Sequence, residues 1–178
     1  RRAALDLPRG SKVKVLEEGG TERYAAVETT DGKLFYLHRK NLVTIDYLSR
    51  QRDEATLRRD ITDTARLFLG TGYRWGGKTA AGLDCSGLAF MSYYMNGIHV
   101  YRDAHVDRSP SLRIIELKQA KEGDLLFFPG HVAIYIGDGL YIHSTTALGG
   151  VGFNSFNPES PIFNEGLKKS LNAVATAF

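Results

Sequence analysis

The pattern of apolar and polar residues near the start of the chain predicts short strands. Val13 and Val15 alternate with lysines, which is the period-two pattern of a half-buried strand. An Asp-Gly pair at 31–32 separates two runs rich in aromatic and aliphatic residues, 24–29 and 34–37, and predicts a hairpin. A stretch this short buries little core by itself. We therefore expect a small β module that packs against the neighbouring part of the chain.

A second segment, from Ser49 to Leu69, changes to helical spacing. Its apolar positions include Leu57, Ile61, Ala65 and Phe68. Gly70 follows as a typical helix stop, so we predict one helix here. The opposite face mixes arginines with carboxylates, and such a mixed-sign face is typically exposed to solvent. We place the domain boundary at this change of pattern, between residues 1–48 and residues 49–178.

The remaining chain predicts an α+β arrangement. A Gly-rich loop precedes a helix from Cys85 to about Met95, and strands are expected over 125–128, 131–136 and 140–144. A helix followed by an antiparallel meander is an α+β pattern, with the helix that carries the cysteine packed on the sheet.

Two histidines of the predicted strands are expected on the same face of the sheet. A two-residue turn at 138–139 would place His131 and His143 on opposite faces and bury one of them. A three-residue loop that includes Gly137 pairs Ala133 with His143 and makes the histidines diagonal neighbours within side-chain reach. The hydrophobic pattern fixes register more firmly than one dipeptide does, so we predict the three-residue loop.

The single cysteine, Cys85, lies at the predicted start of a helix, directly after Asp84. Unpaired N–H groups and the helix dipole favour an anion there and can lower a thiol pKa from about 8.5 to roughly 3.5–7.5. Cys85 is therefore expected to be a reactive thiolate near neutral pH. A buried structural thiol is the alternative.

A thiol together with two histidines predicts a cysteine hydrolase. Cys85 would be the nucleophile, His131 would take its proton, and His143 would orient His131. The backbone N–H of Cys85 would stabilise the oxyanion. The alternatives are Ser86 as nucleophile and a metal held by the same three residues. Structural zinc takes four ligands, and no carboxylate has the spacing to complete the set, so we expect no metal.

Composition narrows the classes of protein that fit. Of 178 residues, 43% are hydrophobic and 24% charged, as in a globular domain. The net charge of +3 gives no argument for a nucleic-acid partner, and no apolar run approaches the roughly 18–20 residues of a transmembrane helix. One cysteine excludes an internal disulfide. The chain opens on Arg1-Arg2-Ala3 without Met, and we expect a processed or truncated piece.

Five motifs make the region 73–144 resemble the NlpC/P60 family of bacterial cell-wall peptidases. These motifs are Tyr73-Arg74-Trp75-Gly76-Gly77, Asp84-Cys85-Ser86-Gly87-Leu88, Lys121-Glu122-Gly123-Asp124-Leu125-Leu126-Phe127-Phe128, His131-Val132-Ala133-Ile134-Tyr135-Ile136-Gly137 and Tyr141-Ile142-His143-Ser144. Residues 1–46 resemble a bacterial SH3 (SH3b) module more weakly. The resemblance implies a papain-like catalytic domain after a small SH3-like β-barrel, with Cys85, His131 and His143 as catalytic residues and neither metal nor organic cofactor.

One branch of this family, with SH3b modules before the catalytic domain, is implied more closely. It cuts peptidoglycan stem peptides between γ-D-glutamate and the following diamino acid, and it prefers a free L-alanine amine. The segment Arg102-Asp103-Ala104 resembles that branch, in which the Asp pairs with the amine, although Tyr101 stands where the branch usually has Pro. Three further positions match residues that line the same pocket: Tyr73, Trp75 and Ser86.

The expected activity is therefore that of a γ-D-glutamyl-L-diamino acid endopeptidase acting on stem peptides or muropeptides. Diaminopimelate and lysine both fit as the third residue. A different amide reaction at the same site, such as acyl transfer, and a non-catalytic wall-binding module are the alternatives. We expect a place in the bacterial cell envelope, with cytoplasmic recycling of muropeptides as the alternative. The sequence favours no particular oligomeric state.

Overall fold

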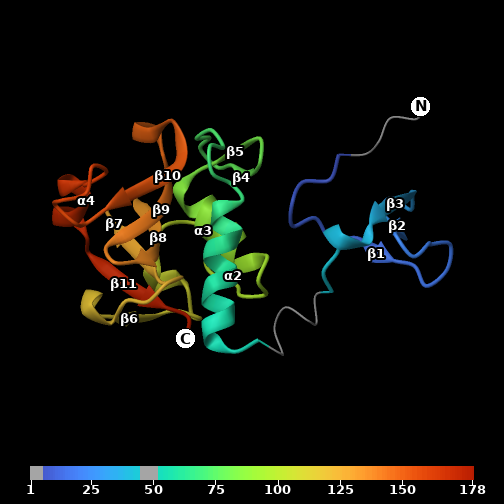
Figure 1. The fold of residues 1–178 in the computed structure, drawn as a ribbon, viewed down its shortest axis with the longest axis horizontal. Helices are drawn as coiled ribbons and strands as arrows, with labels where there is room; N and C mark the ends of the chain where they lie inside the picture. The colour runs from blue at the N-terminus through green and yellow to red at the C-terminus, as the bar shows by residue number, and fades with distance from the viewer. Residues whose placement is uncertain (1–5, 45–51) are drawn as a thin grey trace.

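The N-terminal part of the protein is a three-stranded antiparallel sheet. In the computed structural model, which describes residues 6–44 and 52–178, the strands lie in the order β1-β2-β3 (Figure 1). Their bounds are β1 Lys14–Val15, β2 Tyr24–Glu28 and β3 Leu34–His38, followed by the 3-10 turn η1 Arg39–Asn41. The predicted hairpin at 31–32 is confirmed, because the Gly32 N–H donates to the Thr29 carbonyl at 2.9 Å.

Two expectations for this region have different outcomes. Val15 is 49% exposed and β1 is only two residues long, so the predicted half-buried strand is wrong there. The segment before β1 does contact the next domain, because the Lys12 ammonium lies 5.3 Å from the centre of the Tyr94 ring. The predicted boundary between residues 48 and 49 lies outside the described residues and stays a prediction.

Helix α2, Glu54–Arg66, corresponds to the first predicted helix. It begins where the Asp53 carboxylate accepts the Thr56 N–H at 2.9 Å, which satisfies one of the unpaired donors of the first turn. Ile61 and Ala65 are fully buried against the rest of the domain. Residues 49–51 of the predicted helix lie outside the described residues.

The prediction of a solvated charged face on α2 is wrong for Arg58, which is only 6% exposed. Its guanidinium pairs with the Asp124 carboxylate at 2.7 Å and donates to the Thr176 hydroxyl at 3.0 Å. It also lies 4.2 Å from the centre of the Phe178 ring. Asp124 and Thr176 are far from α2 in sequence, so only the tertiary fold supplies these partners.

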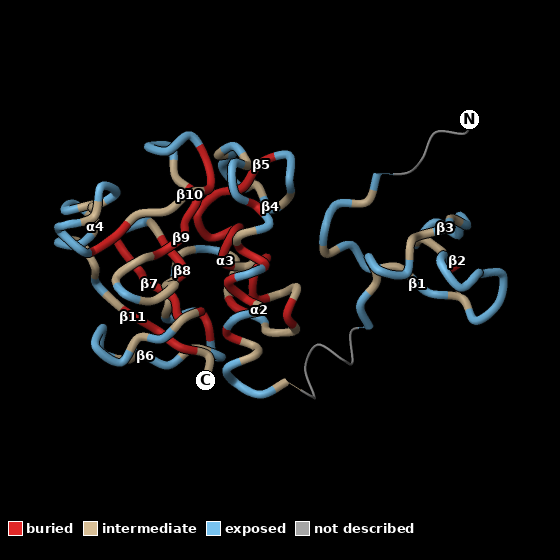
Figure 2. The backbone as a smooth tube through the Cα atoms, viewed as in Figure 1, coloured by how far each residue is buried: buried red, intermediate tan, exposed pale blue. Residues whose placement is uncertain are grey.

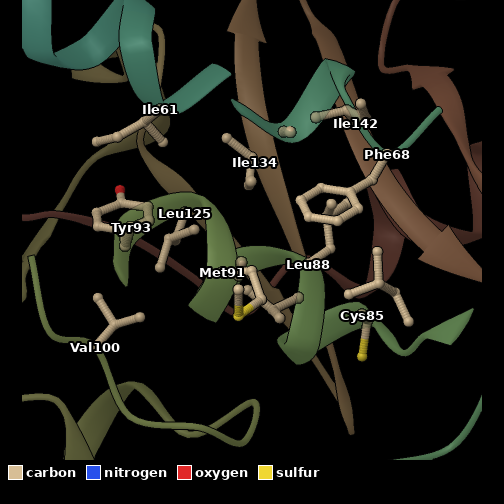
Figure 3. Packing of buried hydrophobic residues seen from close by; sticks show 14 of the residues in the cluster. Ile61, Phe68, Cys85, Leu88, Met91, Tyr93, Val100, Leu125, Ile134 and Ile142 are labelled. Carbon is tan, nitrogen blue, oxygen red and sulfur yellow. The ribbon is translucent and has the colours of Figure 1, made fainter. Parts of the chain in front are cut away.

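Helix α3, Cys85–Tyr94, confirms the predicted cysteine helix and its first residue. Eight of its ten residues are buried, and apolar side chains surround it (Figure 3). A helix that is apolar on all sides belongs inside a core. A short hairpin of β4 Lys78–Thr79 and β5 Gly82–Leu83 leads directly into it.

Helix α3 packs on a six-stranded antiparallel sheet of order β10-β9-β8-β7-β11-β6 (Figure 1). The strands are β6 Arg113–Ile115, β7 Leu125–Phe128, β8 His131–Gly137, β9 Leu140–Thr145, β10 Gly150–Ser155 and β11 Ala173–Thr176. The remaining helical segments are η2 Val106–Arg108, η3 Leu117–Gln119, η4 Thr146–Leu148 and α4 Glu165–Ser170. The α+β prediction, with the Cys85 helix on an antiparallel sheet, is confirmed.

The turn between β8 and β9 differs from the prediction, whereas the register agrees with it. Gly137 pairs with Leu140, so the turn has two residues, and both Asp138 and Gly139 have positive φ values of 50° and 77°. The register shifts between Tyr135 and Gly137, which marks a β-bulge. The bulge absorbs one residue, so the three-residue loop was wrong but the alignment of the strands was right.

Both faces of the sheet are covered, as the buried strands in Figure 2 show. One face packs with α3 through Val132, Ile134 and Ile142. The opposite face, which carries the histidines, buries Tyr141 and Phe128 in a second apolar cluster. His143 is therefore only 1% exposed and must find hydrogen-bond partners inside the protein.

The Arg58–Asp124 pair gives a first testable prediction. Asp124→Ala should lower the free energy of unfolding by about 1.5–3 kcal/mol, because it removes the buried carboxylate of Arg58 and leaves the guanidinium paired with the half-exposed Glu54 carboxylate at 2.8 Å. Urea unfolding of the variant measures this loss. Glu165→Ala, which removes an exposed i,i+4 pair with Lys169 on α4, is the matched control and should change stability little. Equal effects of the two substitutions would contradict the importance of the buried pair.

Candidate functional site

Cys85 is positioned by the cap of helix α3. The Asp84 carboxylate accepts the Gly87 N–H at 2.6 Å and the Gly76 N–H at 2.7 Å, which fixes the helix start against the Gly-rich loop. Figure 3 shows the Cys85 sulfur pointing away from the packed apolar side chains. The residue is 8% exposed, so the thiol lies at the edge of the core.

The expectation that the helix start lowers the thiol pKa is wrong. Burial raises the pKa of Cys85, and the neighbouring charge of Asp84 acts in the same direction. The backbone N–H groups of Val132, Ser86 and Cys85 itself lower it, but by less than burial raises it. The resting side chain is therefore a thiol at neutral pH, and a base must remove its proton before it can attack.

Arg102 binds the residues on both sides of Cys85 in sequence, Asp84 and Ser86, and the Gly-rich loop. Its two terminal nitrogens donate to the two oxygens of Asp84 at 3.1 and 3.2 Å, which is a bidentate pair. Arg102 also donates to the Gly77 carbonyl at 3.1 Å and to the Ser86 hydroxyl at 2.9 Å. The Arg102-Asp103-Ala104 motif indicated a substrate-binding role for Asp103, but the contact between Arg102 and Asp84 was not predicted.

His131 and His143 are brought together as predicted. Nε2 of His131 lies 2.8 Å from Nδ1 of His143, and Nε2 of His143 lies 3.0 Å from Oδ1 of Asn154. Burial and the neighbouring His143 lower the pKa of His131 to about 4, and burial also lowers the pKa of His143. Both rings are therefore neutral at neutral pH.

Sequence reasoning missed Asn154. It lies on β10, opposite Tyr141 of β9, and no strand was predicted in this part of the chain. The alternation of residues 150–155 is weak, because two of the six are glycines. Only the pairing of β10 with β9 brings the Asn154 amide to His143.

Within residues 6–44 and 52–178, no hydrogen bond joins Cys85 to His131, although helix α3 and strand β8, which carry them, pack together. Helix α3 lies on β8, and the backbone N–H of Val132, the residue after His131, is directed to the Cys85 sulfur. The thiol and the imidazole are thus on adjoining segments. Proton transfer between them requires the closer approach that catalytic groups often make only in the substrate complex.

Cys85 opens into a cleft of about 640 Å³. Of the predicted substrate-binding residues, Trp75, Ser86 and Asp103 line it. The Asp103 side chain is 62% exposed and 3.9 Å from Arg102, and the Trp75 side chain stands out from the surface with 85% exposed. Tyr73 is not among the lining residues, and its pKa is raised by burial first and then by the charges of Cys85 and Asp84.

Two further findings concern cofactors and membranes. Within the described ranges, His, Cys, Asp and Glu side chains form no cluster of three suited to holding a metal ion. None of the helices described there combines the length and the apolar character that a membrane crossing requires.

The buried histidines predict a pH-dependent stability. Below about pH 6.5 the unfolded chain protonates His131, whereas the folded protein does so only near pH 4, so the free energy of unfolding should fall across that window by about 3 kcal/mol. Urea unfolding between pH 7 and pH 4 measures this slope. His131→Gln should flatten it, and His105→Gln, at an exposed site, should keep it. An unchanged slope in His131→Gln would contradict the assignment.

Known proteins resemble both the sequence and the fold. Dipeptidyl-peptidase 6 from Lysinibacillus sphaericus is 35% identical over 155 residues, which cover 87% of this chain and 57% of that protein. A γ-D-glutamyl-L-lysine dipeptidyl-peptidase from Bacillus subtilis is 35% identical over 129 residues, which cover 68% of this chain and 41% of that protein. The chain thus spans about half the length of these curated relatives.

Among solved structures, an NlpC/P60 family protein from Bacillus cereus superposes with a TM-score of 0.76 at 25% identity, covering 92% of this chain and 53% of that chain. The NlpC/P60 domain of the peptidoglycan hydrolase SagA has a TM-score of 0.55 at 30% identity, covering 67% of this chain and 97% of that domain. Residues 70–171 match the NlpC/P60 family as a whole. Since this match includes more than half of the chain and the fold agrees, the chain belongs to the NlpC/P60 family.

Proposed function

We propose that this chain is a cysteine peptidase that hydrolyses the γ-D-glutamyl-L-diamino acid bond of peptidoglycan stem peptides with a free N-terminal L-alanine. The observation that carries the proposal is the thiol of Cys85 at a cleft, beside the strand on which His131 is hydrogen-bonded to His143. Nucleophile, base and orienting group are the three parts that such chemistry needs. For a substrate of this kind we propose a location in the bacterial cell envelope.

The proposed reaction begins with general-base catalysis, because Cys85 rests as a thiol and His131 as a neutral imidazole. His131 takes the thiol proton as Sγ bonds to the γ-carbonyl carbon of D-glutamate. The negative charge that develops on the carbonyl oxygen is stabilised by the backbone N–H of Cys85 at the helix start. Because Cys85 and His131 are both neutral at rest, the proton moves from Cys85 to His131 while Sγ attacks the carbonyl carbon.

The second half of the reaction returns the site to its starting state. The C–N bond breaks, and His131 gives its proton to the amine of the departing diamino acid. The D-glutamyl group remains on Cys85 as a thioester. Water then attacks the thioester carbonyl while His131 accepts one of its protons. The C–S bond breaks, His131 returns this proton to the sulfur, and the γ-carboxylic acid is released and loses its own proton to solvent.

Asp103 supports the preference for a free amine. Its carboxylate lines the same cleft as Cys85, and an ammonium group that loses water in a cleft needs a carboxylate partner. The names of the B. subtilis relative and of a Bacillus cereus relative specify a γ-D-glutamyl-L-lysine bond and a dipeptidyl-peptidase. Trp75 would cover the apolar part of the peptide from the other wall.

Substrate cleavage tests the proposed bond and the role of Asp103. L-Ala-γ-D-Glu-L-Lys and its diaminopimelate counterpart should be cut at the γ-bond, and the N-acetylated peptides should not, because acetylation removes the charge that Asp103 binds. Mass spectrometry of the products measures this. Asp103→Asn should lower kcat/KM for the free peptide by about 10-fold or more, the usual cost of losing a desolvated charge partner. Equal cleavage of free and acetylated peptides would refute the amine preference.

Substitution of the catalytic set tests the mechanism. Cys85→Ala and His131→Ala should each lower kcat by about 10⁴-fold or more without unfolding the protein, because each removes a reacting group. His143→Ala should cost less, since His143 orients and does not transfer the proton from Cys85. His99→Ala, at an exposed position beside Tyr94, is the control and should leave kcat unchanged. Normal turnover by Cys85→Ala would eliminate the thiol mechanism.

A further inference from the structure

A continuous line of hydrogen bonds extends the histidine pair to a side chain without an assigned role. It runs from His131 on β8 through His143 on β9 to Asn154 on β10, with distances of 2.8 and 3.0 Å. It continues because the Asn154 amide nitrogen Nδ2 donates to the Ile162 carbonyl at 2.9 Å. Three adjacent strands and the loop after β10 therefore contribute one group each.

The Ile162 carbonyl determines which way round the Asn154 amide lies. A carbonyl oxygen only accepts, so the amide must present its NH₂ group to Ile162 and its oxygen to His143. The same carbonyl accepts the Ser155 N–H at 3.0 Å, and the Asn164 N–H donates back to the Ser155 carbonyl at 3.0 Å. These backbone bonds close the loop on β10 and fix the position of the acceptor.

The orientation of the amide decides the protonation of both rings. An amide oxygen accepts only, so His143 must carry its proton on Nε2, and its Nδ1 is then an acceptor while the ring is neutral. The His131 Nε2 must therefore carry the proton that the 2.8 Å contact uses. Nδ1 is then the single ring nitrogen of His131 that is free to accept the proton of Cys85.

We propose that Asn154 is a positioning residue that sets the tautomers of His143 and His131, so that His131 always presents an unprotonated Nδ1 as the base. This inference rests on the proposed function and adds a fourth member to its proton-handling set. Asn154 touches neither substrate nor the reacting atoms. It acts only through His143.

The substitution Asn154→Asp separates this role from a merely structural one. A carboxylate in place of the amide favours protonated His143, whose Nδ1–H then points at His131. His131 is left to accept on Nε2 and to carry its own proton on Nδ1, which is the wrong tautomer for a base. Activity at low pH is then lost earlier, because His143 takes up its proton at higher pH.

Other titratable groups near the pair do not change in this pH range. Besides His131, the ring of Tyr141 faces His143, and the centres of the Tyr141 and His143 rings are 5.3 Å apart. Burial raises the pKa of Tyr141 to about 12. Phe128, the other ring against His131, does not titrate. Cys85, whose pKa burial raises, titrates on the alkaline side. A shift of the acid side of the pH profile of kcat/KM therefore reflects a change in the protonation of the histidine pair.

The test measures kcat and KM against pH on the L-Ala-γ-D-Glu peptide for the wild type, Asn154→Ala, Asn154→Asp and Asn157→Ala. Asn154→Ala should lower kcat by about 10–100-fold with KM nearly unchanged, as when an orienting partner of a functional imidazole is lost. Asn154→Asp should move the acid limb of kcat/KM upward by about one pH unit or more. Asn157, whose amide oxygen accepts the Glu159 N–H in the loop after β10, is the matched control and should show neither effect.

A second measurement needs no substrate and separates this inference from the proposed function. In the Cys85→Ala protein, ¹⁵N NMR of the imidazole nitrogens should find the proton of His143 on Nε2, and adding Asn154→Asp should protonate both nitrogens at neutral pH. A wild-type acid limb in Asn154→Asp, or a His143 proton on Nδ1, would overturn the inference. If no peptide is cut, the proposed function fails while the NMR result still decides the role of Asn154. Asn154→Asp keeps the size of the side chain, so it serves if Asn154→Ala does not fold.

Discussion

Polar side chains on the central sheet depend on partners inside the protein, because both faces of the sheet are covered. Helix α3 covers one face, and a second apolar cluster around Tyr141 covers the other. A buried polar group without a hydrogen bond costs about 1–3 kcal/mol, so the fold supplies partners for buried groups such as His143 and Arg58. The buried Tyr141 hydroxyl, on the same sheet, has no hydrogen-bond partner among the described residues. The line from His131 to Asn154 and the pairing of Arg58 with Asp124 are two results of this one constraint.

The same burial sets the electrostatic state of the site. It keeps Cys85 protonated and both histidines neutral, so Cys85 and His131 do not form a thiolate–imidazolium pair in the resting protein. Next to the thiol, the charges of Asp84 and Arg102 neutralise each other through a bidentate contact. A site of this kind depends on the correct placement of a single proton, which gives the tautomers of the histidine pair their importance. Loss of a neutral orienting group would therefore affect turnover more than folding.

Local patterns predicted the parts of the fold that depend on neighbours in sequence. The pattern after the Gly-rich loop predicted a helix from Cys85, and the alternation around His131 predicted the register of β8 with β9. The turn between these strands shows the limit of such reasoning. The Asp-Gly pair favours a two-residue turn, whereas the hydrophobic pattern favoured a three-residue loop. The protein has the two-residue turn and keeps the predicted register through a bulge between Tyr135 and Gly137. The turn propensity of the dipeptide and the burial of the strand residues act on different residues, so the structure satisfies both preferences.

The sequence alone determined that a helix begins at Cys85 and that His131 and His143 share one face of a sheet, because helical spacing and strand alternation are local properties of the chain. Only the tertiary structure decided that Asn154 meets His143, that Arg58 is buried, and that the pKa of Cys85 is raised. Each of these depends on groups distant in sequence or on the loss of water around a side chain. Desolvation and long-range pairing arise only when the strands and helices pack, so no local pattern carries them.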